Sequence, residues 1–124
     1  MRIADTEWRV MRIVWQQGPV GAAEVIAAVL PETGWSHRTV RSLLNRLVKK
    51  GALRAELVEG RNIYAAKVSQ SQGVRQASRS FLKKVFDGDA SRMLVHFVEH
   101  EKMTAEQIKE LRALLDSKRK KTGE

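Results

Sequence analysis

The sequence predicts a mainly α protein of the α+β class, with an N-terminal winged helix-turn-helix and a C-terminal helical dimerisation domain. Three helical segments with apolar stripes precede two short strand-like runs around a turn, and every segment after residue 69 is helical in period again. Three helices before a hairpin are typical of a winged helix. We therefore expect a winged-helix domain over residues 1–68 and a helical domain over residues 69–124.

The first expected helix lies in "DTEWRVMRIVWQQGPV", where Asp5 or Thr6 is a candidate cap and Gly18-Pro19 ends the segment. Its apolar face contains Trp8, Met11, Val14 and Trp15. The second lies in "GAAEVIAAVLPETG" and is expected to stop at Pro31 and Gly34. Its inward residues are Val25, Ile26, Val29 and Leu30.

The third expected helix is the segment "WSHRTVRSLLNRLVKKG". Ser36 is a suitable N-cap, and Trp35 with Val40 can form a hydrophobic staple. Gly51 stands where a left-handed residue commonly ends a helix. The segment contains five basic residues and no acidic one. A helix that is merely solvated usually carries some Glu or Asp, so the basic face is interpreted as a surface that binds a polyanion.

On this helix, the side chains that face away from the apolar stripe are Arg, Lys, Asn, Ser and Thr, which bind base edges and phosphates. Recognition helices present their N-terminal half to bases. The expected base-reading residues are Arg38, Thr39, Arg41, Ser42 and Asn45. The expected phosphate-binding residues are Arg46, Lys49 and Lys50, together with Arg61 of the hairpin. For Arg61, a simple role as a turn residue is almost equally compatible with the sequence.

The β-hairpin is expected from the runs Leu53–Val58 and Ile63–Val68 around the turn Glu59–Asn62. After it, short amphipathic segments each need a partner for their apolar stripe, so two copies of the chain are expected to bury these stripes against each other. Thr104 and Gln107 form a capping-box pair before the last segment. The expected dimerisation residues are Phe81, Leu82, Val85, Leu94, Phe97, Ile108, Leu111 and Leu115.

Composition narrows the functional class. The 124-residue chain has a net charge of +9, which is typical of a protein that binds nucleic acid. It contains no cysteine, so disulfides and Cys-based metal or redox sites are excluded. No apolar run is long enough for a membrane span and the N-terminus does not read as a signal peptide, so we expect a cytoplasmic protein with no membrane insertion. No catalytic residues, cofactor or metal site is expected.

The segments "EWRVMRIVW", "WSHRTVRSLLNRLVKKG" and "NIYAAKV", followed by "FLKKVFDGD", "LVHFVEHE" and "IKELRALL", resemble the repressors that control β-lactamase and penicillin-resistance genes, and their copper-responsive relatives. The resemblance covers nearly the whole chain. It implies a homodimer that binds a palindromic double-stranded DNA operator and represses transcription.

The resemblance also bears on regulation. Copper-responsive relatives sense metal through C-terminal cysteines, which this chain lacks. In antibiotic-responsive relatives, a membrane-bound sensor system triggers cleavage between an Asn and a Phe on a dimerisation helix. The matching bond here joins His96 to Phe97, so Phe is retained and His replaces Asn.

Other readings of the sequence remain open. "HFVEH" fits the H-x-x-E-H pattern of zinc peptidases, but a third ligand and a substrate cleft are not evident. The tryptophans are read as core residues, although they could stack on single-stranded bases. A winged-helix adaptor that binds protein is the alternative function, and double-stranded RNA binding is disfavoured by its deep, narrow groove.

Overall fold

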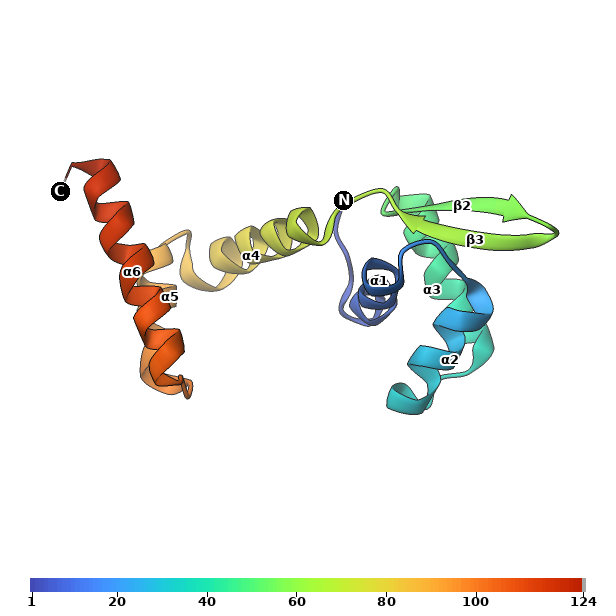
Figure 1. Ribbon diagram of the computed structural model, residues 1–124, viewed down its shortest axis with the longest axis horizontal. Helices are drawn as coiled ribbons and strands as arrows, with labels where there is room; N and C mark the ends of the chain where they lie inside the picture. Colours follow the sequence, from blue (N-terminus) through green and yellow to red (C-terminus); the bar gives the residue numbers. More distant parts are fainter. Residues whose placement is uncertain (124) are drawn as a thin grey trace. The chain divides into compact units, whose positions relative to one another are not determined.

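The computed structural model describes residues 1–123 and confirms a mainly helical fold with a small antiparallel sheet (Figure 1). The elements are α1 (Asp5–Gln17), β1 (Val20–Gly21), α2 (Ala22–Thr33), α3 (His37–Lys50), β2 (Leu53–Val58), β3 (Arg61–Ala66), α4 (Gln70–Phe86), α5 (Ala90–His100) and α6 (Ala105–Thr122). Three helices followed by a hairpin form a winged helix. No helix within residues 1–123 is both long and apolar enough to cross a membrane.

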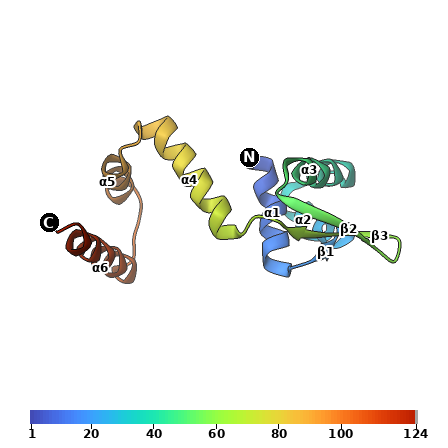
Figure 2. The same cartoon turned by 90° about the horizontal axis from the view of Figure 1, so that it is seen from above.

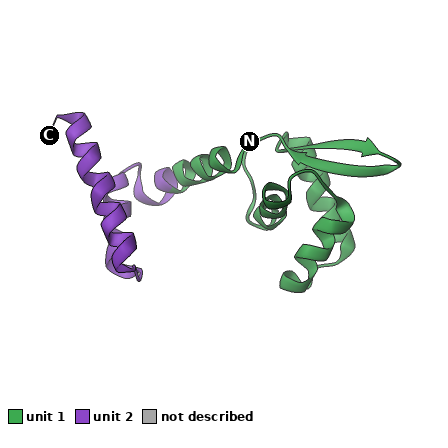
Figure 3. Cartoon of the chain, in the orientation of Figure 1, with its two compact units in different colours: residues 1–81 green, residues 82–124 purple. Residues whose placement is uncertain are grey.

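The chain forms two compact units, residues 1–81 and residues 82–124 (Figure 3). The division falls inside α4, because the first turns of this helix belong to the winged-helix unit. Gly73, on α4, is buried, and a Cβ there would lie 3.0 Å from the ring of Trp15. The indole N–H of Trp15 donates to the carbonyl of Val68 at 2.9 Å. Trp15 of α1 therefore packs against the start of α4 and is hydrogen-bonded to the segment just before it.

The core of the first unit lies where the three N-terminal helices meet the sheet. Its largest fully buried apolar side chains are Val10, Met11, Val14, Val25, Val29, Val40, Leu44, Leu47 and Leu53. Trp8 and Trp15 are half-buried against this cluster, with ring centroids 5.6 Å apart. Each of the three helices contributes to one contiguous core, which fixes the orientation of α3 relative to α1 and α2.

The ends of α3 are those that the sequence predicts. The hydroxyl of Ser36 accepts a hydrogen bond from the backbone N–H of Thr39 at 3.1 Å. Gly51 has φ of +85°, and its N–H and that of Ala52 donate to carbonyls of the last turn. A residue with a Cβ is strained in that left-handed conformation, so glycine suits the end of the helix.

The hairpin differs from its predicted form at the turn. The first strand occupies Leu53–Val58 as expected, but the second begins at Arg61 because Val58 pairs with Arg61 across the two-residue turn Glu59–Gly60. The two-residue strand β1 pairs with β3 and gives the order β1-β3-β2. Figure 2 shows the strands beside α2 and α3, so the exposed hairpin forms a wing next to the third helix.

Two helix boundaries are also corrected. The N-cap of α1 is Ala4 rather than Asp5 or Thr6, and the backbone N–H of Ala4 donates to the Glu7 carboxylate at 2.7 Å. Pro31 does not stop α2 but lies in its last turn, and the helix ends at Gly34, which is left-handed. A proline lacks the N–H that would bond the carbonyl four residues earlier, so Pro31 costs α2 one intrahelical hydrogen bond without ending the helix.

In the second unit, α5 and α6 expose apolar side chains in the single chain. Thr104 and Gln107 form the expected capping box before α6, with hydrogen bonds of 3.1 Å and 2.9 Å. The residues predicted for dimerisation are partly buried at Leu82, Leu94 and Leu111 and exposed at Phe81, Val85, Phe97, Ile108 and Leu115. Val95, Val98 and Leu114 extend the exposed apolar surface. None of the side chains on α5 and α6 is fully buried.

Candidate nucleic-acid interface

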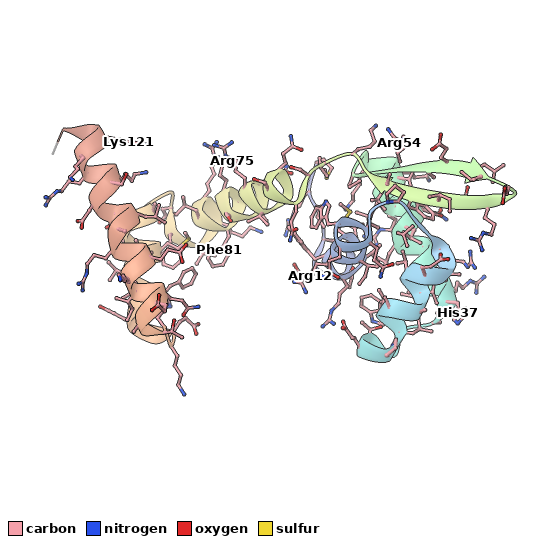
Figure 4. All side chains as sticks on the ribbon, in the orientation of Figure 1. Arg12, His37, Arg54, Arg75, Phe81 and Lys121 are labelled. Atoms are coloured by element: carbon pink, nitrogen blue, oxygen red, sulfur yellow. The ribbon has the colours of Figure 1, made fainter. Side chains whose placement is uncertain are left out.

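The candidate interface is the outer face of α3, and its exposure follows the helical period. Val40, Leu43, Leu44 and Leu47 are buried in the core. The side chains that the sequence assigns to DNA are all exposed: Arg38, Thr39, Arg41, Ser42, Asn45, Arg46, Lys49 and Lys50. His37 marks the N-terminal end of this helix in Figure 4. The apolar and polar faces of α3 are therefore separated in the folded chain.

Three cations on this face have no acidic partner. Within residues 1–123, Arg38, Arg41 and Lys49 take part in no ion pair, and no carboxylate lies on α3 itself. An unpaired exposed cation keeps its charge available to a polyanion, since no internal partner has to be displaced first. These residues place three unpaired positive charges on one exposed face of α3.

The neutral residues of this face differ in whether their side chains are already hydrogen-bonded within the protein. The hydroxyl of Thr39 lies 3.1 Å from the Ser36 hydroxyl, so it takes part in the N-terminal cap. Ser42 and Asn45 form no side-chain hydrogen bond within the part of the chain that the structure describes. Of the three, Ser42 and Asn45 are therefore better placed than Thr39 to bond a base edge.

Lys50 and Arg46 are placed differently from Lys49, because both contact a buried carboxylate of α1. Glu7 is 0% exposed, and it is the one buried polar or charged residue among residues 1–123. Its Oε1 accepts hydrogen bonds from Lys50 Nζ at 2.6 Å and from the Ala4 N–H at 2.7 Å. Its Oε2 lies 3.4 Å from Arg46 Nε and has no hydrogen-bond partner among the described residues. Two of the predicted phosphate-binding residues thus also belong to an internal charge cluster, which we call the Glu7 cluster.

Glu7 is ionised in this cluster. Burial by itself raises the pKa of the Glu7 carboxyl, but the hydrogen bonds from Lys50 and the Ala4 N–H, together with the charges of Lys50 and Arg46, outweigh it. The pKa therefore lies below its ordinary value of 4.5. At neutral pH the cluster contains one negative and two positive charges.

Sequence reasoning missed Glu7, although a signal for it was present. Glu7 precedes Met11 by four residues and Val14 by seven, so it lies on the apolar stripe of α1. A charged residue on a buried stripe needs a partner of opposite charge. The pattern therefore indicated that Glu7 needs a buried cationic partner, but not which basic residue supplies it.

The wing supplies a second group of charged residues. A notch of about 280 Å³ lies between the start of α2, α3 and the wing. It is lined by Gly21, Ala22, Ala23, Glu24, Arg41, Gly60, Arg61, Asn62 and Tyr64. Arg61 Nη2 lies 4.0 Å from a Glu24 carboxylate oxygen, and both side chains are largely exposed. The fold thus brings Arg41 and Arg61 to the same notch, with Glu24 as a competing partner for Arg61.

The His96–Phe97 bond lies within α5, and both residues are exposed. The rings of His96 and His100 stack with centroids 4.4 Å apart, and His100 Nδ1 lies 2.9 Å from the carbonyl of His96. Within residues 1–123, no group of three or more His, Cys, Asp or Glu side chains is placed to hold a metal ion. The two imidazole rings of "HFVEH" thus lie one helical turn apart and stack on each other.

The chain is similar to known repressors over almost its full length. The penicillinase repressor family model matches residues 3–117. The chain is 32% identical to the penicillinase repressor of Bacillus licheniformis, over 99% of this chain and 96% of that protein. It is also 32% identical to the methicillin resistance regulatory protein MecI of Staphylococcus aureus strain N315, with 94% of each covered.

A solved structure agrees with these relatives. The solution structure of monomeric Bacillus licheniformis BlaI in complex with the blaP half-operator matches 58% of this chain and 88% of that chain. The TM-score is 0.52 and the sequence identity 30%. The family match, the two relatives and the winged-helix fold agree, and the chain belongs to the penicillinase repressor family.

Proposed function

We propose that this repressor binds a palindromic double-stranded DNA operator as a homodimer, with α3 in the major groove. The protein is a DNA-binding transcriptional repressor and not an enzyme. The observation that carries the proposal is the carboxylate-free outer face of α3, where Arg38, Arg41 and Lys49 are exposed and unpaired within residues 1–123. Such a repressor acts on the chromosome, so its proposed location is the cytoplasm.

The proposed base readers are Arg38, Arg41, Ser42 and Asn45, with Thr39 in a lesser role because of its bond to the N-cap. The N-terminal half of a recognition helix points at base edges, and Arg bonds guanine while Asn bonds adenine. Lys49 is a proposed phosphate contact. Arg61 would bind the backbone beside the notch only after it parts from Glu24.

The proposed dimer forms through the exposed apolar residues of α4, α5 and α6. Two recognition helices must reach grooves about 34–36 Å apart, or a multiple of that distance. The proposed release step, triggered by a membrane-bound sensor system, is cleavage of the His96–Phe97 bond. Both residues are exposed, and because the bond lies inside α5, this helix must unwind locally before a protease can cleave it.

The test is a binding measurement with the DNA upstream of the protein's own gene and with random duplex DNA. Arg41→Ala should relax base preference and cost roughly 1–3 kcal/mol on the operator, whereas Lys49→Ala should weaken binding to every sequence and reduce the salt slope by about one. Equal effects of both substitutions on all sequences would contradict the assigned roles. Binding of random duplex without a steep loss at higher salt would instead favour a protein-binding adaptor.

A further inference from the structure

Glu7 holds its two cationic partners with different strength, and Lys50 is held more tightly. Its Nζ donates to Glu7 Oε1 at 2.6 Å and to the carbonyl of Arg2 at 2.9 Å. Two of the three ammonium donors are therefore occupied inside the fold. The Lys50 side chain is 31% exposed, compared with 55% for Arg46. Lys50 keeps one further N–H, but its ammonium could move outward to a phosphate only by giving up two hydrogen bonds and leaving a buried carboxylate.

Arg46 is held more loosely. Its contact with Glu7 is made through Nε at 3.4 Å, and Oε2 receives no hydrogen bond at that distance. A guanidinium has five N–H donors in a rigid fork, so an arginine that uses Nε inward keeps the four N–H groups of its terminal nitrogens for another acceptor. Glu7 and Lys50 cancel in charge, which leaves the cluster with the single positive charge of Arg46.

We propose that Glu7 is a positioning residue that divides the cations of α3, keeping Lys50 inside the fold and directing the terminal nitrogens of Arg46 toward a DNA phosphate. The inference rests on the proposed function and deepens it. It states that the C-terminal half of α3 supplies two phosphate contacts, from Arg46 and Lys49. Lys50 supplies none, although it follows Lys49 directly and carries the same charge.

The slope of log affinity against log salt, measured with a random duplex, gives the number of phosphates that the protein contacts. Arg46→Gln and Lys49→Gln should each lower the slope of log affinity against log salt by about 0.9. The double variant E7Q/K50Q should keep the slope of the unmodified protein. This variant leaves net charge unchanged and neutralises both members of the buried pair, so long-range electrostatics are matched. A loss of about 0.9 in the slope of E7Q/K50Q, with a further loss of about 0.9 when Arg46→Gln is added to it, would place Lys50 on a phosphate and overturn the inference.

The positioning of Arg46 by Glu7 is tested with a substitution that keeps the charge of residue 46. Arg46→Lys keeps the charge and hence the salt slope. The donors of a lysine all lie on one nitrogen, so they cannot span Glu7 and a more distant phosphate as Nε and the terminal nitrogens of a guanidinium can, and affinity should fall roughly fivefold, the equivalent of one lost hydrogen bond. In the E7Q/K50Q background the same substitution should cost roughly half of that factor or less, because the orienting carboxylate charge is gone. An equal loss in both backgrounds would show that Glu7 does not position Arg46.

One measurement requires no substitution. The side-chain ammonium of Lys50 should keep its NMR resonance when random duplex is added to the unmodified protein, whereas that of Lys49 should shift. A comparable shift at Lys50 overturns the inference even if E7Q/K50Q does not fold. Failure of the unmodified protein to bind duplex in a salt-dependent way would refute the proposed function itself, and it is seen before any variant is compared.

Discussion

At the scale of single residues, the ionised Glu7 carboxylate requires compensation, because it has no contact with solvent. Lys50 at 2.6 Å and the Ala4 N–H at 2.7 Å provide it at one oxygen. A buried charge that loses its partner destabilises a protein far more than replacement of the whole pair by neutral groups. The cluster also connects the first turn of α1 to the last turns of α3, so a single residue links the N-terminal segment to the candidate interface.

Acid should weaken the fold through Glu7. Its pKa is lowered in the folded state, so its contribution to the free energy of unfolding is present above the ordinary value of 4.5 and is lost as pH falls through the folded pKa. We expect E7Q/K50Q to lose less stability than the unmodified protein between about pH 6 and about pH 2. Urea unfolding of both proteins across this range measures the difference. Parallel curves would show that Glu7 is not responsible.

The exposed residues of α3 were predictable because the helical period alone separates them from Val40, Leu43, Leu44 and Leu47. The internal role of Lys50 was not predictable in the same way. Its partner lies 43 positions away in the sequence, and such a contact depends on how α1 crosses α3. Periodicity identifies the face of a helix but not which cation on that face meets a buried acid from another helix.

At the scale of secondary-structure elements, α3 is defined at both ends by local chemistry. The Ser36 hydroxyl accepts from the Thr39 N–H, and Gly51 adopts the left-handed conformation that ends the helix. Both features depend only on residues close in the sequence, which is why they could be predicted. The bounds of the second strand, which was predicted at Ile63–Val68 and lies at Arg61–Ala66, and the existence of β1 depend instead on strand pairing, such as that of Val20 with Tyr64. The polar residues Arg61 and Asn62 also lack the apolar alternation that marks a strand.

The cap of α3 provides a prediction with an internal control. Ser36→Ala removes the side-chain acceptor for the Thr39 N–H and should lower the free energy of unfolding by about 1 kcal/mol. Ser42→Ala, on the exposed face of the same helix, should change it by less than about 0.5 kcal/mol. Thermal or urea unfolding compares the two. A loss at Ser42 as large as that at Ser36 would mean that the cap is not the source of stability.

At the scale of the whole molecule, the apolar stripes of the C-terminal helices were predicted from their spacing, and many of these side chains are exposed in a single chain. The division between compact units at residues 81 and 82 does not coincide with the functional division expected at residue 69. The reason is the contact of Gly73 with Trp15, which binds the start of α4 to the first unit. This contact is possible because Gly73 has no side chain, and the pattern of apolar residues in the sequence gives no sign of it.

Dimerisation should fail when charges are placed on α6. The double variant Ile108→Asp and Leu115→Asp puts two carboxylates on side chains that are 44% and 46% exposed, so the single chain should still fold. We expect a monomer in sedimentation velocity and a loss of affinity for a full palindrome of roughly 100-fold or more, with little change on a half-site. Leu57→Asp, at a 70% exposed position on the wing, is the control for an added carboxylate elsewhere and should stay dimeric.

The carboxylate-free side of α3 also affects how the protein is distributed in a living cell. A helix face with no negative side chain has no charge that repels the phosphates of non-operator DNA. A genome offers about 10⁶–10⁹ such competing sites. Most copies would then be held on unrelated stretches of chromosome, with only a small free pool. Occupancy of the target promoter would then depend on the number of repressor molecules per genome. Dilution of the repressor during rapid growth would weaken repression without any inducer.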